Sequence, residues 1–235
     1  MKRLARIPGG RRAPSEEEPE IGAETLRVLS SLTERGVLLK QDKHLPNVVT
    51  LLTGERLSAS WWSHAKGRLI FWVLSELSDH PDVLLVKLIS EKDTFVHRRL
   101  WPPFLAVATS RDEWQLRRLS SAALRLLEKI DSSDKPVLSQ GAAVKELVAR
   151  LLVHGTAVHT ESGRHEMAVE SWSTWSRTAR VASIRSAAKA RLALERACQA
   201  IGAERDALPW VSAEEPPSRG ATRARPPKSE AQGDR

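Results

Sequence analysis

The chain has 235 residues, a formal net charge of +8 at pH 7 and a pI of about 10.0, which favours an anionic partner, either nucleic acid or a membrane. An arginine-rich composition without any partner is the alternative. The single cysteine, Cys198, excludes an internal disulfide and a cysteine zinc site, and it fits a reducing, cytoplasmic setting. No apolar run reaches the roughly 20 residues of a membrane span, and no signal-peptide pattern is evident.

The first half of the chain begins with a predicted disordered tail over residues 1–21, where large apolar residues are few. A helix is predicted over residues 23–35, because Leu26, Leu29 and Leu32 share one face, and Gly36 is a plausible stop. Residues 37–39 extend the apolar signal as a strand or a last turn. Residues 47–53 read as either a β-type run or a short helix capped by Asn47, and we favour the helix.

The central stretch combines a helix with two β-type runs. A helix is predicted over residues 65–78, with Ile70, Val73 and Leu77 on one apolar face. Residues 79–81 break it, and two strands follow at residues 83–89 and 94–100, joined by a turn at residues 90–93. A helix that leads into a tight hairpin is typical of the end of a winged-helix domain. This helix is more apolar than a typical helix that contacts bases in the major groove of DNA.

The hairpin has one face that we expect to be buried, although alternation alone leaves both choices open. With the turn at residues 90–93, Ile89 would face Thr94. One face would then carry Val83, Leu85, Lys87, Ile89, Val96, Arg98 and Leu100. We favour burial of the opposite face, which carries Leu84, Val86, Leu88 and Phe95.

The second half is predicted to be helical. Helices are expected over residues 104–108, 111–130, 142–159 and 165–203, with a loop at residues 131–140 as the internal boundary and a disordered tail over residues 209–235. No internal repeat is evident. The predicted fold class is therefore mainly α (α+β), with a winged-helix-like domain over residues 22–109, whose hairpin is the only confident β structure, and a helical C-terminal region over residues 110–208. The segments outside residues 21–208 each carry a net charge of +1, which leaves +6 for the part between them.

Two groups of residues are candidates for nucleic-acid binding. Aromatic rings beside cations can stack on bases and hold phosphates. A hydrophobic staple below the helix is the alternative for the first group, and an edge strand protected by charge is the alternative for the second. The first group is Trp61, Trp62, His64, Lys66 and Arg68, and the second is His97, Arg98 and Arg99. If the chain binds duplex DNA, we expect Lys66, Arg68, Arg98 and Arg99 to form one surface.

The last predicted helix carries a basic stripe that suits phosphates or an acidic protein partner, with a solvated helix face as the alternative. Arg180, Arg185 and Lys189 are the positions through which an acidic partner would dock.

Signs of catalysis or of a bound metal are weak. Five residues, His154, His159, Glu161, His165 and Glu166, cluster in the sequence but lack the spacing of a His-Glu-x-x-His motif. A Gly-x-Ser-x-Gly elbow and a phosphate-cradling glycine loop are both missing, and Cys198 lies among apolar neighbours. We therefore expect no metal and no cofactor, and a non-catalytic protein is favoured.

Residues 60–114 and 144–175 resemble uncharacterised bacterial proteins related to the alkylation-repair, crosslink-unhooking DNA glycosylases. The segments that carry this resemblance are Ser-Trp-Trp-Ser-His at residues 60–64, Asp-His-Pro-Asp-Val-Leu at 79–84, residues 94–101 and His-Thr-Glu-Ser-Gly at 159–163. Those glycosylases consist of tandem winged-helix domains, so the resemblance implies DNA binding. Their catalytic Gln-x-Gln or Gln-x-Asp motif is matched only by Gln232-Gly233-Asp234, which lies in the predicted C-terminal tail and outside the segments that carry the resemblance. The chain is also too short for several winged helices.

These observations predict a cytoplasmic DNA-binding or DNA-repair-associated winged-helix protein that is not itself an enzyme. A glycosylase-like enzyme with unidentified catalytic residues is one alternative. An interaction module that docks an acidic protein is another.

Overall fold

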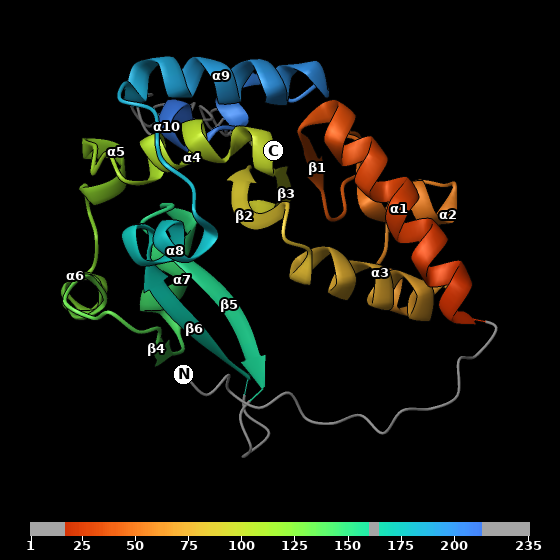
Figure 1. The fold of residues 1–235 in the computed structure, drawn as a ribbon, viewed down its shortest axis with the longest axis horizontal. Helices are drawn as coiled ribbons and strands as arrows, with labels where there is room; N and C mark the ends of the chain where they lie inside the picture. The colour runs from red at the N-terminus through yellow and green to blue at the C-terminus, as the bar shows by residue number, and fades with distance from the viewer. Residues whose placement is uncertain (1–16, 160–164, 213–235) are drawn as a thin grey trace, which may run out of the picture.

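The computed structural model describes residues 17–159 and 165–212 (Figure 1). It is mixed α+β, 54% helical and 17% strand, with two small three-stranded sheets. The predicted predominance of helix over strand is therefore confirmed. Within the described part, no helix is both long enough and apolar enough to cross a bilayer. Most of both predicted tails lies outside the described residues.

The first half forms one sheet with helices. Its helices are α1 (Glu17–Arg35), α2 (Val48–Thr53), the short 3-10 turn η1 (Trp61–Ser63) and α3 (Gly67–Asp79). Its strands are β1 (Val37–Leu39), β2 (Val83–Ile89) and β3 (Lys92–His97), and β3 lies in the middle of the antiparallel order β1-β3-β2. The predicted hairpin is confirmed, but β3 begins two residues earlier than expected and residues 98–100 are a 3-10 turn, η2 (Arg98–Leu100).

Local chemistry explains two of these element ends. The Asn47 side chain accepts a hydrogen bond from the backbone N–H of Thr50 at 2.8 Å, so the predicted cap of α2 is confirmed. Gly36 ends α1 with a φ of +85°, and a Cβ at this position would lie 2.7 Å from the Arg99 guanidinium. Only glycine combines this left-handed backbone with so close an approach.

The first sheet is buried on both faces, which corrects the expectation of a single buried face. The register pairs Leu84 with Val96 and Leu85 with Phe95, and Ile89 lies opposite Lys92 rather than Thr94. Phe95 packs with α1 and α3, whereas Leu84 faces the other way. The predicted face therefore mixes two faces of the sheet, because a register shift between Lys87 and Ile89 displaces the pairing by one residue.

A run of helices then connects the two sheets. It consists of α4 (Trp101–Ala108), α5 (Glu113–Leu116) and α6 (Ser121–Asp131). The helix predicted over residues 111–130 is interrupted between α5 and α6, where Arg118 has a left-handed φ of +62° and Ser120 caps the next helix through a bond to Ala123 N–H. The interruption lets α6 turn away and pack against α7.

The second half is not the helical region that the sequence predicts. Its elements are β4 (Val137–Ser139), α7 (Ala142–Ala149), β5 (Val153–His159), β6 (His165–Ser171), α8 (Trp172–Ala179), α9 (Ala187–Ala200), η3 (Arg205–Ala207) and α10 (Pro209–Ser212). The predicted helix over residues 142–159 ends at Ala149 and continues as a strand. The predicted helix over residues 165–203 begins as β6 and is broken again between α8 and α9.

The second sheet repeats the order of the first. Its strands lie in the order β4-β6-β5, so in both sheets the third strand lies between the first and the second. In both, a helix precedes the first strand and another precedes the hairpin. No internal repeat is evident in the amino-acid sequence, because the two halves share an arrangement of elements and not a pattern of residues.

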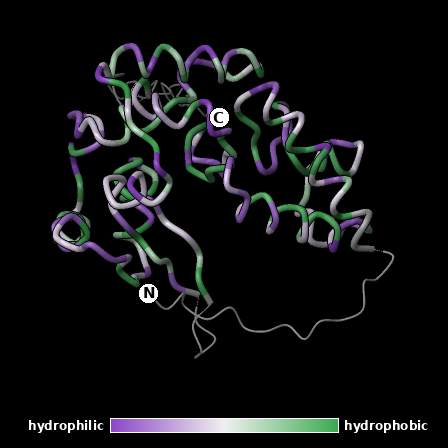
Figure 2. Tube along the Cα trace, in the orientation of Figure 1, coloured by the Kyte–Doolittle hydropathy of each residue, from purple (hydrophilic) through white to green (hydrophobic). Residues whose placement is uncertain are grey.

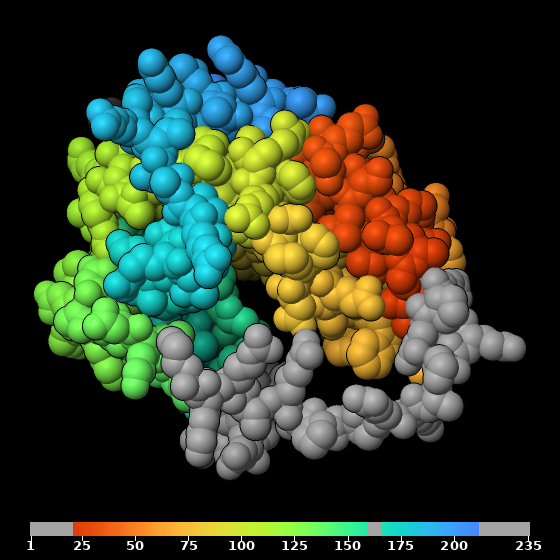
Figure 3. Space-filling view, in the orientation of Figure 1, coloured from red at the N-terminus to blue at the C-terminus, as the bar shows by residue number. Residues whose placement is uncertain are grey.

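A shared core joins the two halves across the expected boundary at residue 110. It contains β1 and β3 residues, most of α4, Trp172 of α8 and the inner face of α9. In Figure 1, α9 lies across α4 at one end of the molecule, and Figure 2 shows hydrophilic and hydrophobic positions alternating along it. Figure 3 shows the molecule hollowed between α3 and the β5–β6 hairpin.

The C-terminal segment belongs to this core as well. The Trp210 side chain is 1% exposed, and its indole N–H donates to the Glu195 carboxylate at 2.9 Å. Trp114 contacts Trp210 edge to face, with ring centroids 6.2 Å apart. The predicted disordered tail from residue 209 is therefore wrong for residues 209–211, as is the first tail for residues 17–21, which lie in α1.

We predict that Trp210→Ala lowers the free energy of unfolding by about 3–5 kcal/mol, because it removes a buried ring and leaves a cavity. Leu192→Ala on α9 is the control, since Leu192 is 51% exposed. Urea unfolding followed by circular dichroism measures both. Equal midpoints for the two variants would contradict a docked C-terminal segment.

Candidate nucleic-acid interface

The first predicted group lies at the N-terminal end of α3. His64 holds this turn together, because its Nδ1 accepts the backbone N–H of Lys66 at 3.0 Å and its Nε2 lies 3.1 Å from Glu55. The Lys66 ammonium donates to the backbone carbonyl of Leu52 at 2.7 Å, which leaves its positive charge on the surface. Arg68 is exposed on the first turn of α3. Lys66 and Arg68 thus add charge where the helix N-terminus is already positive.

The two adjacent tryptophans of this group have different environments. Trp61 is 5% exposed and packs with the core of the first sheet, whereas Trp62 is 65% exposed. Their rings are stacked, with centroids 4.0 Å apart and planes 24° from parallel. The hydrophobic-staple alternative is therefore supported for Trp61 only.

Trp62 begins a row of rings that continues along α3. Its ring centroid lies 5.8 Å from that of Phe71, which lies 5.6 Å from that of Trp72. Phe71 and Trp72 are 42% and 45% exposed. We call Trp62, Phe71 and Trp72 the ring row. Phe71 and Trp72 were not among the predicted site residues.

The two arginines of the second predicted group, at the end of β3, form contacts with other residues of the same chain. Arg98 lies 3.4 Å from Asp82 and its guanidinium stands over the Trp101 ring. Arg99 donates to the carbonyl oxygen of Glu34 at the end of α1. Burial lowers the pKa of His97 and, together with the positive charge of Arg99, outweighs the opposing charge of Asp82. His97 therefore carries less positive charge at neutral pH than a histidine with an unshifted pKa.

The two groups do not form the single surface that the sequence analysis expects. Lys66 and Arg68 lie beside the first residues of α3, whereas Arg98 bonds to Asp82, just after its last residues. A helix of 13 residues is about 20 Å long. The expectation assumed that the wing lies close to the N-terminal end of the central helix, but residues 98–99 lie at the end of β3 that is away from the hairpin turn.

The hairpin turn is tied to the rest of the molecule. Ser90 and Glu91 both have left-handed φ values, +48° and +56°, and the Ser90 N–H donates to the Ala207 carbonyl at 2.7 Å. The lysines around the turn are neutralised by carboxylates, in the ion pairs Lys40–Asp93, Lys87–Asp93 and Lys92–Asp42. The turn therefore offers little free charge to a phosphate backbone.

The basic positions of the C-terminal region are partly available. Arg180, Arg185 and Lys189 are exposed, and none of them forms an ion pair with a described residue. Arg191 instead pairs with Asp112, and Arg177 lies 3.5 Å from Asp134. The expected stripe along one helix is broken, because Arg180 ends α8 with a left-handed φ and α9 begins at residue 187.

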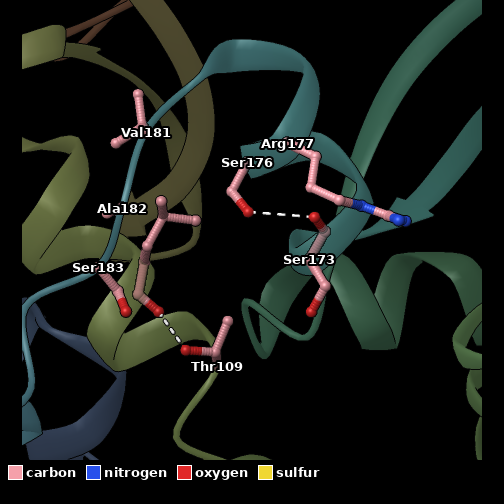
Figure 4. Close-up of a pocket in the computed structure, with 8 residues that line it drawn as sticks. Thr109, Ser173, Ser176, Arg177, Val181, Ala182 and Ser183 are labelled. Atoms are coloured by element: carbon pink, nitrogen blue, oxygen red, sulfur yellow. Dashed lines mark hydrogen bonds between the residues drawn. The ribbon is translucent and has the colours of Figure 1, made fainter.

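A pocket of about 630 Å³ opens between α4, α8 and the segment that leads to α9 (Figure 4). Four of its lining residues carry hydroxyl groups. Ser176 donates to the Ser173 carbonyl and Thr109 to the Leu105 carbonyl, and Arg177 points away from Thr109 and Ser183. The lining residues are Leu105, Thr109, Ser173, Ser176, Arg177, Val181, Ala182 and Ser183. No strongly charged group points into this pocket in Figure 4.

One histidine–carboxylate pair lies at the junction of the two halves. His154 and Glu170 are partners across β5 and β6, with Nδ1 and Oε1 3.3 Å apart. The His154 ring lies 5.5 Å from Trp172 and 5.6 Å from Trp175. The pair was not predicted, because residue 154 was assigned to a helix. Among the described residues, no three histidine, cysteine or acidic side chains gather as a metal cluster.

The single cysteine has no nucleophilic character. Burial, reinforced by the charge of Glu195, raises the pKa of the Cys198 thiol to about 12. It stays a protonated thiol at neutral pH, which agrees with the unreactive setting that the sequence predicts.

Charge is unevenly divided between the halves. Residues 17–109 contain 11 Lys and Arg against 12 Asp and Glu, a net charge of −1. The described residues from 110 to 212 contain 15 against 11, a net charge of +4. The basic excess of the folded part therefore lies in the second half, and nucleic-acid binding by α3 would depend on local charge.

Comparison with protein-family models, with curated proteins and with solved structures finds no match.

The buried ion pair beside the hairpin turn should show in acid unfolding. Burial alone would raise the pKa of Asp42, but hydrogen bonds from the Leu45 N–H, Lys92 and the His44 N–H outweigh it and lower the pKa to about 2. A carboxylate with a depressed pKa stabilises the fold above its unfolded pKa of about 3.9, and this contribution is lost as pH falls towards 2.

We predict that Asp42→Asn lowers the free energy of unfolding by about 2 kcal/mol between pH 5 and 7, from a pKa shift of roughly two units. The difference from wild type should shrink below about pH 4. Urea unfolding at several pH values measures it, with Asp134→Asn, whose side chain is 94% exposed, as the control. A difference that persists unchanged to pH 3 would contradict the assigned ion pair.

Proposed function

We propose that this protein is a DNA-binding or DNA-repair-associated protein of the winged-helix type, and that the N-terminal end of α3 is its contact with nucleic acid. The observation that carries the proposal is the exposed positive charge of Lys66 and Arg68 on the first turn of α3. Backbone N–H groups at a helix N-terminus favour phosphate oxygens, and cations beside them strengthen that preference. The role proposed is binding without catalysis.

The order of the elements supports this proposal. A winged helix has the order helix, strand, helix, helix and hairpin, with the short first strand paired to the last, and residues 17–97 have this order. The second sheet repeats it in reduced form, without a counterpart of α2. Tandem units of this kind are what the resemblance to crosslink-unhooking glycosylases implies, and they argue against the expectation that the chain is too short for more than one.

Two of the glutamines that the structure describes give the glycosylase alternative little support. Gln115 is fully buried, and its amide bonds to the carbonyls of Ala108 and Arg150 while its oxygen accepts the Asp112 N–H. Gln41 donates to the Ala59 carbonyl. Both side chains form hydrogen bonds to the backbone of the same chain, so neither is positioned to act on a substrate.

The acidic-partner alternative has one specific observation in its favour. Arg180, Arg185 and Lys189 are exposed and form no ion pair with a carboxylate of residues 17–159 or 165–212, and they lie in the half of the chain that carries the positive charge. An acidic protein segment could pair with them, although exposed pairs of this kind contribute only about 0–1 kcal/mol each.

We predict that Lys66→Ala/Arg68→Ala weakens binding of duplex DNA and reduces the slope of log affinity against log salt by about 1.8, or 0.9 for each phosphate contact. Arg98→Ala/Arg99→Ala is the matched control, because it removes the same charge at the other end of α3, and its slope should stay near that of wild type. Salt titrations followed by fluorescence anisotropy, with melting curves for each variant, measure this. A larger loss of slope for the 98/99 variant would contradict the proposed contact.

A further inference from the structure

The ring row is an unusual exposure of aromatic surface. The chain has eight tryptophans and three phenylalanines, and all eleven lie in the described residues. Among them, only Trp62, Phe71 and Trp72 are exposed, and the three contact one another in sequence along α3. Scattered apolar residues are normal on a surface, but a contiguous aromatic patch marks an interaction site.

The two rings of the row that belong to α3, Phe71 and Trp72, lie on the solvent-exposed face of this helix, and its opposite face is fully packed. Ile70, Val73 and Leu77 fill the buried face of the helix, and each is fully buried. Phe71 and Trp72 follow Arg68 at spacings of three and four residues, so the three side chains share one exposed face. The fold is complete without the rings, which are therefore left for a partner.

The geometry of Trp62 shows how a partner would be held. One face of its indole is stacked on Trp61, which is fixed in the core and supports it from below. Trp62 is 65% exposed, so much of the ring that is not covered by Trp61 is accessible to solvent. A flat ring placed there would extend an existing stack, and the partner would meet a ring that is already held in place.

The two ends of the ring row carry opposite charge. Lys66, Arg68 and the helix N-terminus place positive charge at one end of α3, and Glu76 and Asp79 place negative charge at the other. A partner must therefore bring flat rings and, at the N-terminal end, negative groups. A nucleic-acid strand with unpaired bases has both, whereas a duplex keeps its base faces stacked inside.

We propose that the ring row is a stacking platform for unpaired bases, so that the preferred substrate is nucleic acid with a bubble, flap or single-stranded segment. This inference rests on the proposed nucleic-acid function and specifies its substrate class. Trp62 stacks on a base, Phe71 and Trp72 line the path of the strand, and Lys66 and Arg68 hold its phosphates. Aromatic platforms of this kind tolerate any sequence, because every base has a flat face.

The test compares two labelled oligonucleotides, a fully paired duplex and the same duplex with six mismatched thymines at its centre. Wild type should bind the bubbled DNA at least about tenfold more tightly. Trp62→Ala should lose roughly 5- to 150-fold on the bubble and less than about twofold on the duplex, with an unchanged salt slope, since stacking and not charge is removed. Trp62→Phe should retain most of the affinity.

Leu192→Ala is the control for loss of an exposed apolar side chain elsewhere, and it should leave both affinities unchanged. Trp72→Ala repeats the test in case Trp62→Ala disturbs the fold, as judged by its melting curve. Equal binding of duplex and bubble, with both tryptophan variants neutral, would overturn the stacking platform and leave the DNA-binding proposal standing. No binding of either oligonucleotide at low salt would overturn both.

Discussion

The fold depends on one cluster of aromatic rings at the junction of its two halves. Trp101 and Phe104 on α4 meet Trp175 and Trp172 on α8 edge to face, with centroids 5.1 Å and 5.0 Å apart. Such pairs contribute about 0.5–1.5 kcal/mol each beyond the burial of their surface. The indole N–H of Trp101 donates to the carbonyl of Val96 in β3, and that of Trp172 donates to the carbonyl of Leu151, between α7 and β5, so each ring is also bonded to the backbone of its own half.

This junction determines which surfaces remain exposed. Helix α7, which precedes the second hairpin as α3 precedes the first, contacts β2 of the other half. The turn of the first hairpin is bonded to Ala207, and α9 covers α4. Packing between the halves thus covers elements that an isolated unit would expose, whereas the outer face of α3 stays open.

The sequence was informative where local chemistry decides the structure and misleading where tertiary packing does. The Asn47 cap, the stop at Gly36 and the strand at residues 83–89 were all readable, because each depends on neighbouring residues. The second hairpin was missed, since Val144, Leu147, Leu151 and Val158 fit a helical stripe, although Gly155 and Thr156 disfavour a helix. The site was half predicted: Trp62, Lys66 and Arg68 were identified, but which tryptophan is exposed depends on the core beneath them.

The most direct test of the account is to find where an unpaired base lies on the protein. A bubbled duplex with a photoreactive iodouracil in its unpaired segment can be irradiated with the protein, and the cross-linked residue identified by mass spectrometry. If the ring row stacks on unpaired bases, the cross-link should form at Trp62, with Phe71 or Trp72 as the next sites. Cross-links confined to residues 177–189 would contradict it, because the contact would then be the basic segment of the second half and not the ring row of α3.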